Sequence, residues 1–151
     1  MQTEVTGMVL KATQVGDYDR RLVILTKERG KISAFVRGVR RAGNPLTAAS
    51  QPFAYGRFTL FSGRDAYRVQ SIEVQNYFDE VKTDLDGITY GTYFCELAEH
   101  LTHENLDDRE QLKLLYVTLR AIAKKQVTAE LIRLIYEIRA MALEGEEMQV
   151  F

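Results

Sequence analysis

The sequence predicts an α+β protein in which a five-stranded antiparallel barrel precedes an α-helical bundle. Three observations lead to this fold class. Residues 1–78 contain short stretches rich in β-branched and aromatic residues, separated by turn signals. Residues 79–151 instead repeat apolar residues at helical spacing. The two parts also differ in charge: the first holds 12 basic and 6 acidic side chains, whereas the second holds 8 and 15. We therefore divide the chain into domains 1–78 and 79–151.

Five strands are expected in the first domain, and their patterns indicate how each is buried. They span residues 4–13, 21–26, 31–37, 53–61 and 66–74. The continuous apolar run Leu22–Leu25 indicates a second strand buried on both faces, whereas the third strand alternates between apolar and polar residues. In the fifth strand the alternation slips between Val69 and Ile72, which predicts a β-bulge near Gln70.

The links between these strands predict how they are connected. Short turns at residues 28–30 and 62–65 favour two antiparallel hairpins. A longer link joins the third strand to the fourth, as in a small Greek-key barrel. We therefore expect residues 1–78 to form an OB-fold.

Three amphipathic helices are expected in the second domain. The first should span residues 84–102, and the second should start behind a capping box formed by Asp107 and Glu110. The third should begin at a Thr128 cap and end at Gly145. Helices of this kind pack on one another or on the barrel. The expected inward face of the third helix comprises Leu131, Leu134, Ile135, Ile138 and Ala142.

Several features favour a cytoplasmic protein that does not contact membranes. The N-terminus has no basic head followed by an apolar stretch, so no signal peptide is expected. No segment approaches the ~20 apolar residues that a bilayer-spanning helix needs. The single cysteine, Cys95, excludes an internal disulfide and is typical of a reducing compartment.

Residues 31–46 carry four basic side chains and no acidic one, although the whole chain has a net charge of −1. On the outward face of the third strand, Lys31, Ser33, Phe35 and Arg37 interleave cations with an aromatic ring, and a glycine-containing basic loop follows. Cations neutralise phosphates and aromatic rings stack on bases, which together suit single-stranded nucleic acid. We expect DNA to follow the outer face of the second and third strands. The candidate DNA-binding residues are Arg37, Arg40, Arg41, Lys31, Phe35, Arg20, Arg21 and Lys27.

The alternative function is that of a protein-interaction adaptor, because OB barrels also bind peptides and fold does not determine function. The basic domain would then attract an acidic peptide tail, and the helices would supply an apolar groove. An enzyme is not expected, since no phosphate-binding glycine motif and no catalytic constellation occurs. His100 and His103 lack a third ligand at metal-site spacing, so neither a metal nor another cofactor is expected. Cys95, on an apolar helix face, is interpreted as a core residue.

The order of motifs along the whole chain resembles that of the RecO family of bacterial recombination mediators. The matching motifs are Gly7–Leu10, Asp19–Val23 with Arg21 inserted before Leu22, Thr26–Lys31, Arg37–Arg41, Gln51–Phe53 and the helical segment Tyr90–Leu101. The resemblance implies an OB-fold followed by a helical domain.

The same resemblance implies a DNA-binding, strand-annealing protein of the RecF pathway, which is not an enzyme. Such proteins help to load recombinase onto single strands coated by single-strand-binding protein. The implied ligand is single-stranded DNA, and the implied protein partners are RecR and the C-terminal tail of single-strand-binding protein. Double-stranded DNA is a further expected ligand, because phosphate attraction alone does not choose between single strands and duplex. The implied location is the cytoplasm, at the nucleoid when DNA is bound. By this similarity, Arg37, Arg40 and Arg41 match the basic loop that the family uses for DNA.

Many family members carry a small zinc module after a segment similar to LEGEEMQVF, and this sequence ends there, at Phe151. We therefore expect a helical domain that stops before that module and has no zinc site.

Overall fold

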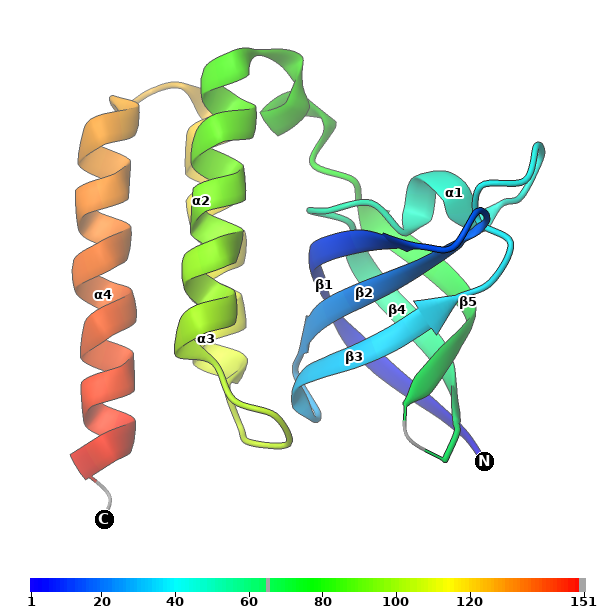
Figure 1. The fold of residues 1–151 in the computed structure, drawn as a ribbon. Helices are drawn as coiled ribbons and strands as arrows, with labels where there is room; N and C mark the ends of the chain where they lie inside the picture. Colours follow the sequence, from blue (N-terminus) through cyan, green and yellow to red (C-terminus); the bar gives the residue numbers. More distant parts are fainter. Residues whose placement is uncertain (65, 150–151) are drawn as a thin grey trace.

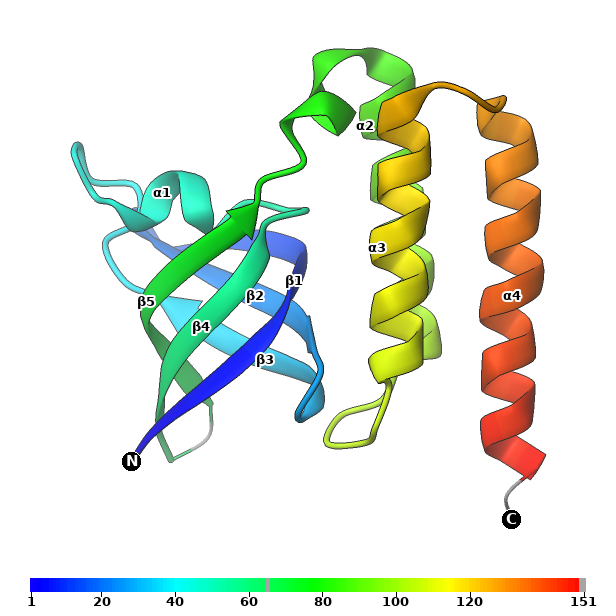
Figure 2. The same ribbon diagram turned by 180° about the vertical axis from the view of Figure 1, so that it is seen from behind.

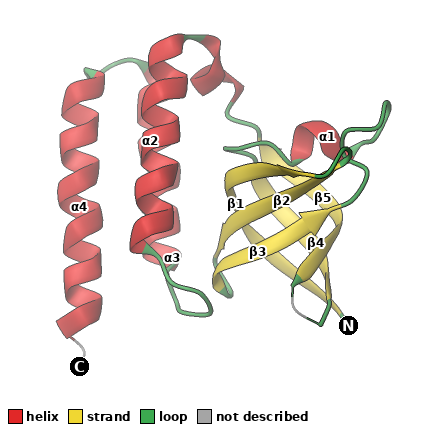
Figure 3. Ribbon diagram, viewed as in Figure 1, coloured by secondary structure: helices red, strands yellow, loops and turns green. Residues whose placement is uncertain are grey.

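A computed structural model describes residues 1–64 and 66–149. Figure 1 shows a closed β-barrel beside a row of long helices, with a short irregular connection between them. Figure 3 shows that the strands lie in the first part of the chain and the long helices in the second. The predicted α+β class, a barrel followed by helices, is confirmed. Within the described residues, no helix is both long enough and apolar enough to cross a membrane.

The barrel closes in the strand order β1-β2-β3-β5-β4. Four of its five pairings are antiparallel, but β3 and β5 pair in parallel through Ala34–Tyr67 and Phe35–Arg68. The expectation of a wholly antiparallel barrel was wrong at this pair. Strand direction cannot alternate around a closed ring with an odd number of strands, so one neighbouring pair has to be parallel. The strands are β1 (Gln2–Val15), β2 (Asp19–Thr26), β3 (Gly30–Val36), β4 (Tyr55–Ser62) and β5 (Tyr67–Asn76).

The register between β4 and β5 confirms the predicted bulge. Thr59 pairs with Ser71 and Leu60 pairs with Val69, so Gln70 has no partner on β4. The extra residue shifts the side-chain alternation of β5, as the slipped apolar pattern in the sequence requires.

The remaining elements are helical and connect or follow the strands. Asp84 caps α2 by accepting a hydrogen bond from the Gly87 N–H, and Thr128 caps α4 as expected, with its Oγ1 3.4 Å from the Leu131 nitrogen. Their bounds are α1 (Leu46–Ala49), η1 (Asp79–Thr83), α2 (Leu85–Leu101), α3 (Arg109–Lys124) and α4 (Ala129–Gln149).

The expected start of the second long helix near Asp108 is confirmed, since α3 begins at Arg109, but its capping box and the expected end of α4 at Gly145 were wrong. The N-cap position of α3 is occupied by Asp108 and not by Asp107, and the Asp108 carboxylate accepts from the His103 N–H at 2.8 Å instead of capping the helix. This hydrogen bond joins the two ends of the loop that precedes α3. The last helix, α4, was expected to end at Gly145 but continues past it. A run of residue types with good helix propensity follows the glycine.

The apolar run of β2 is buried on both faces, as predicted. Leu22 and Ile24 point into the barrel core, whereas Val23 and Leu25 point outward into a second core shared with the helices. Figures 1 and 2 show α2 and α3 between the barrel and α4. The barrel and the helices thus share one continuous apolar interface, which fixes the helices against β1 and β2.

The expected inward face of α4 was wrong. The buried positions are Ile132, Tyr136 and Ala140, which pack toward α2 and α3. The residues expected inside are exposed, with Leu134 at 52% and Ile138 at 61%. Apolar residues occupy both sides of this helix, so helical periodicity alone does not select a face. Tyr136 decides the orientation, because its ring lies 5.0 Å from that of Phe94, centroid to centroid, and its hydroxyl donates to the Phe94 carbonyl at 3.3 Å.

We expect Tyr136→Ala to lower the free energy of unfolding by about 3 to 5 kcal/mol, because it removes a large buried ring and leaves a cavity. Ile138→Ala should change it by at most about 0.5 kcal/mol, since that side chain is already exposed. Urea unfolding followed by circular dichroism measures both. Equal losses in the two variants would contradict the orientation of α4.

Candidate nucleic-acid interface

The outward face of β3 carries the residues that the sequence analysis placed there. Ile32, Ala34 and Val36 are buried in the barrel, and the side chains between them lie on the outer surface. Lys31 and Phe35 on this face are both half-buried. The alternation predicted for this strand is therefore confirmed, and its outward face forms one side of the candidate site.

A groove runs along β3, formed by two adjoining pockets of about 570 and 470 Å³. The pockets share Phe35, Ala66 and Tyr67, so the ring of Phe35 lies where they meet. We call the whole depression the β3 groove. Its lining comprises Asp19, Arg21, Lys31, Ile32, Ser33, Phe35, Arg37, Phe61, Ser62, Gly63, Ala66, Tyr67, Arg68, Glu104 and Asn105.

The second wall of the β3 groove adds aromatic rings and cations that the sequence analysis missed. The Arg68 guanidinium lies 5.5 Å from the Phe61 ring centroid, and that of Arg29 lies 5.9 Å from the Tyr67 ring. Arg29 also donates to the Tyr67 hydroxyl at 3.1 Å. The β3–β5 pairing brings Tyr67 and Arg68 to the groove, and no local pattern in the sequence signals a contact between strands so far apart in the chain.

At one end of the β3 groove, the loop after β3 presents the three arginines Arg37, Arg40 and Arg41, all exposed. The loop is held at its base, because the Asp19 carboxylate accepts from the Gly38 N–H at 2.9 Å. The Arg41 guanidinium stacks 4.3 Å from the Tyr18 ring centroid. This arrangement leaves a concentrated positive charge with solvent access beside the aromatic groove.

Two candidate cations have structural partners. Lys31 Nζ donates to the Glu99 carbonyl at the end of α2, at 2.7 Å. Arg20 Nη1 donates to Ser50 Oγ at 2.7 Å and to the Thr47 carbonyl at 3.0 Å, which anchors the link between β3 and β4. Burial, and then the neighbouring positive charge of Arg40, lower the pKa of Arg20. These two side chains stabilise the frame of the site.

The other two candidate cations on β2 and its turn lie in different depressions of the surface. Arg21 is exposed in the β3 groove and donates to Ser33 Oγ at 3.0 Å. Lys27 lies outside the groove, beside α3. Between them, the helices cover the outward side chains Val23 and Leu25. The outer face of β2, along which DNA was expected, is therefore covered beyond Arg21, whereas β3 and β5 line the groove.

A second depression of about 510 Å³, the interdomain pocket, lies between the barrel and α3. Its floor is apolar and aromatic, with the Tyr55 and Tyr116 rings 4.8 Å apart in an edge-to-face contact. Its lining comprises Lys27, Tyr55, Arg109, Glu110, Leu112, Lys113, Tyr116 and Val117.

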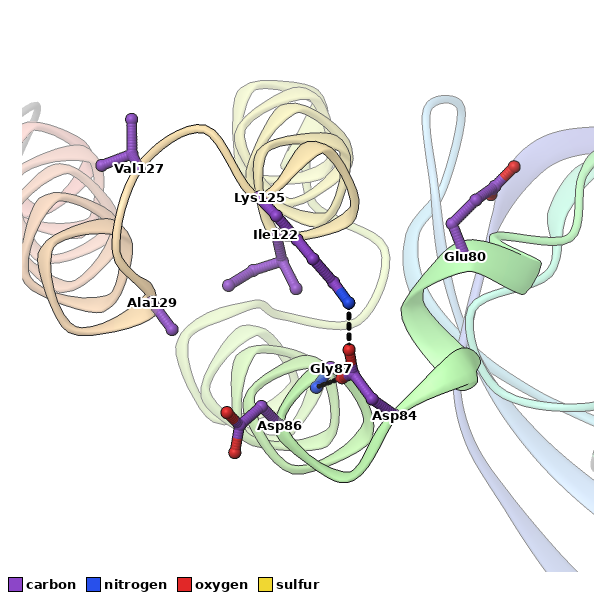
Figure 4. A pocket seen from close by; sticks show the side chains of 8 residues that line it. All are labelled: Glu80, Asp84, Asp86, Gly87, Ile122, Lys125, Val127 and Ala129. Carbon is purple, nitrogen blue, oxygen red and sulfur yellow. Dashed lines mark hydrogen bonds and ion pairs between the residues drawn. The ribbon is translucent and has the colours of Figure 1, made fainter.

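A third pocket, of about 230 Å³, lies where α2 begins and α3 ends, and it is acidic (Figure 4). Asp84 bonds to the Gly87 N–H at 2.7 Å and forms an ion pair with Lys125. The hydrogen bond from Lys125, and then that from Gly87, lower the pKa of the Asp84 carboxyl. The pair ties the start of α2 to the end of α3, while Glu80 and Asp86 make this end of the molecule unsuited to phosphate.

This lowered pKa predicts a pH dependence. The stabilisation from ionised Asp84 should be fully present above the ordinary pKa of 3.8 and be lost as the pH falls through the lower folded-state value. Asp84→Asn should therefore be less stable than the native chain at neutral pH, and the difference should shrink in strong acid. Thermal melts from neutral to strongly acidic pH measure this. A difference that stays constant across the series would contradict the role of the carboxylate.

The histidines and the cysteine are the side chains outside the groove best suited to bind a metal or to act as nucleophiles. Among the described residues, no group of three or more His, Cys, Asp or Glu side chains could hold a metal ion. His103 Nδ1 lies 3.8 Å from an oxygen of the buried Asp108. Cys95 is buried in the core between the domains, where burial raises the pKa of its thiol.

Comparison with known proteins identifies two matching family models. Residues 1–78 match the model described as recombination protein O, N terminal, and residues 82–150 match recombination protein O, C terminal. Among similar curated proteins, the DNA repair protein RecO of Alkaliphilus metalliredigens is 35% identical over 96% of this chain and 59% of its own length. Those of Acetivibrio thermocellus and Desulforudis audaxviator are 32% and 33% identical, over 94% and 95% of this chain and 57% of their own lengths. The chain thus spans less than three fifths of each of these relatives.

Proposed function

The chain belongs to the recombination protein O family, and from this premise we propose that it acts in DNA repair and recombination by binding single-stranded DNA in the β3 groove. The observation that carries this proposal is the juxtaposition of aromatic rings along the groove with the exposed arginine loop at its end. The protein is proposed to be a mediator without catalytic turnover, acting in the cytoplasm and at the nucleoid when DNA is bound.

Each part of the groove has a proposed role. Arg37, Arg40, Arg41 and Arg21 neutralise phosphates, and the Phe35 ring offers a face for base stacking. The β3 strand has seven residues, so the groove is about 23 Å long and holds only a few nucleotides. Tyr67 and Arg68 supply the opposite wall.

Two features favour single strands over duplex DNA. Stacking on Phe35 or Tyr67 requires bases that are not already stacked in a duplex, so the rings contribute only to single-strand binding. The arginine loop attracts any phosphate backbone and gives duplex DNA a weaker mode of binding. A strand held in this way has part of its charge neutralised, which lowers the repulsion that opposes annealing to a second strand.

The family relationship also suggests partners. We propose that the chain cooperates with RecR and helps to load recombinase onto single strands coated by single-strand-binding protein. The charge distribution suits DNA binding by one part of the chain and protein contacts by the other. Residues 1–78 carry a net charge of +6, which attracts DNA, whereas residues 79–151 carry −7.

Fluorescence anisotropy with a labelled single-stranded oligonucleotide across a salt series tests the proposed function. If four to seven phosphates are neutralised, log affinity should fall against log salt with a slope of roughly −3 to −5, at about 0.7 per phosphate. An unlabelled duplex of the same length should compete less well than the single strand. An absence of binding at low salt would overturn the proposal.

A second candidate function is that of an adaptor for an acidic peptide, such as the C-terminal tail of single-strand-binding protein. The interdomain pocket favours it, because its apolar and aromatic floor is lined by three basic residues, Lys27, Arg109 and Lys113, against one acidic residue, Glu110. Competition separates the two functions. A peptide seated in the interdomain pocket should leave oligonucleotide binding unchanged, because the pocket and the β3 groove have no lining residue in common.

A further inference from the structure

The loop between α2 and α3 (residues 102–108) is bound to the turn between β2 and β3 by main-chain hydrogen bonds. The Lys31 N–H donates to the His103 carbonyl, and the Asn105 N–H donates to the Arg29 carbonyl, both at 3.1 Å. Glu104 forms isolated β-bridges with Gly30 and Lys31. Figures 1 and 2 show the loop beside this turn. A part of the helical domain is therefore fixed to the end of β3.

This attachment places Glu104 and Asn105 in the lining of the β3 groove, at the end away from the arginine loop. The pocket at this end also contains Ser33 and the rings of Phe35 and Tyr67. The two ends of the groove thus differ in their polar groups: exposed arginines follow β3, whereas an exposed carboxylate lies among Arg21 and Lys31 at the other end.

The two cations that line this end of the groove with Glu104 keep their charge but donate hydrogen bonds to neutral groups and not to its carboxylate. Lys31 Nζ donates to the Glu99 carbonyl, and Arg21 Nη2 donates to Ser33 Oγ. Among the side chains of residues 1–64 and 66–145, none forms a hydrogen bond or ion pair with the Glu104 carboxylate. An ionised carboxylate here repels phosphate, but it accepts hydrogen bonds from the exocyclic amine of a base, as at N4 of cytosine. Thymine has no such amine and presents only carbonyl oxygens beside its methyl group.

We propose that Glu104 is a specificity-determining residue that makes this end of the β3 groove select a base with an exocyclic amine over thymine. The inference rests on the proposed function, because it requires single-stranded DNA in the groove. On this account the base stacks against Phe35 or Tyr67 and turns its amine toward the carboxylate, while the phosphates lie toward the arginines.

The test compares oligo-dC and oligo-dT of equal length, bound at neutral pH to the native chain and to Glu104→Gln. The glutamine is nearly isosteric, and its amide both donates and accepts, so it accommodates either base. The ratio of the two affinities should favour oligo-dC in the native chain and fall about fivefold in the variant, the low end of what one good base contact supplies. Glu110→Gln, which removes the same charge on α3 outside the groove, should leave the ratio unchanged.

Each of the following other results would overturn the inference. If Glu104→Gln binds both oligonucleotides more tightly by the same factor, the carboxylate only repels phosphate. If the ratio falls equally in Glu110→Gln, the effect does not come from the groove. If the native chain binds neither oligonucleotide, the proposed function fails and this inference fails with it, whereas binding with an unchanged ratio overturns the inference alone.

Discussion

Gly30→Ala is expected to lower the free energy of unfolding by about 3 to 4 kcal/mol, although it adds only one methyl group. Gly30 has a φ of +64°, a conformation that costs an alanine about 1 kcal/mol. A Cβ there would also overlap the Leu106 carbonyl oxygen and lie 2.6 Å from that of His103. Both atoms are backbone, so the whole loop would have to withdraw from the barrel. Its two hydrogen bonds to Lys31 and Arg29 would then be lost, at about 1 kcal/mol each.

Gly16→Ala is the matched control for this substitution. Gly16 has a nearly identical φ of +61°, but no atom of another described residue, apart from its two chain neighbours, lies within 4 Å of the position of an added Cβ. The free energy of unfolding of Gly16→Ala should therefore fall only by the cost of the left-handed backbone conformation, about 1 kcal/mol. Urea unfolding of both variants separates backbone strain from the loop contact. Equal losses would show that the loop does not press on Gly30 as the structure indicates.

The triple substitution Arg37→Ala, Arg40→Ala and Arg41→Ala is expected to reduce the affinity for single-stranded DNA about 100-fold at 0.1 M salt. The salt slope should become shallower by about 2, because three phosphate contacts at about 0.7 each are removed. The protein should stay folded, since all three side chains are exposed. Fluorescence anisotropy across a salt series measures both quantities.

The control replaces Lys113, Arg120 and Lys124, which are exposed on α3, with alanine. It removes the same total charge at a distance from the β3 groove. Its affinity should change far less than that of the arginine variant, and its salt slope should stay close to the native value. If the two triple variants weaken binding equally, DNA responds to net charge and not to the arginine loop.

Features written into short stretches of sequence were predicted correctly. The apolar run Leu22–Leu25 indicated burial on both faces, the alternation of β3 separated its core side from its groove side, and the parity slip indicated the bulge at Gln70. Each of these follows from the geometry of a single strand, in which neighbouring side chains point to opposite faces. The basic loop could also be recognised from the sequence, because its charged residues lie close together in the chain.

Features that depend on contacts between distant segments were decided only by the tertiary structure. Helical spacing in α4 allowed two faces, and the contact of Tyr136 with Phe94 selected one. The charge of Lys31 suggested a phosphate contact, but the end of α2 supplies a carbonyl that binds it. The pairing of β3 with β5 supplied Tyr67 as the second wall of the groove. The sequence by itself thus determined the strands, the bulge and the charged loop, because local periodicity specifies them. The tertiary structure decided which side chains share a groove and which cations are available to a ligand. Both depend on packing between segments far apart in the chain, and residue spacing does not encode such packing.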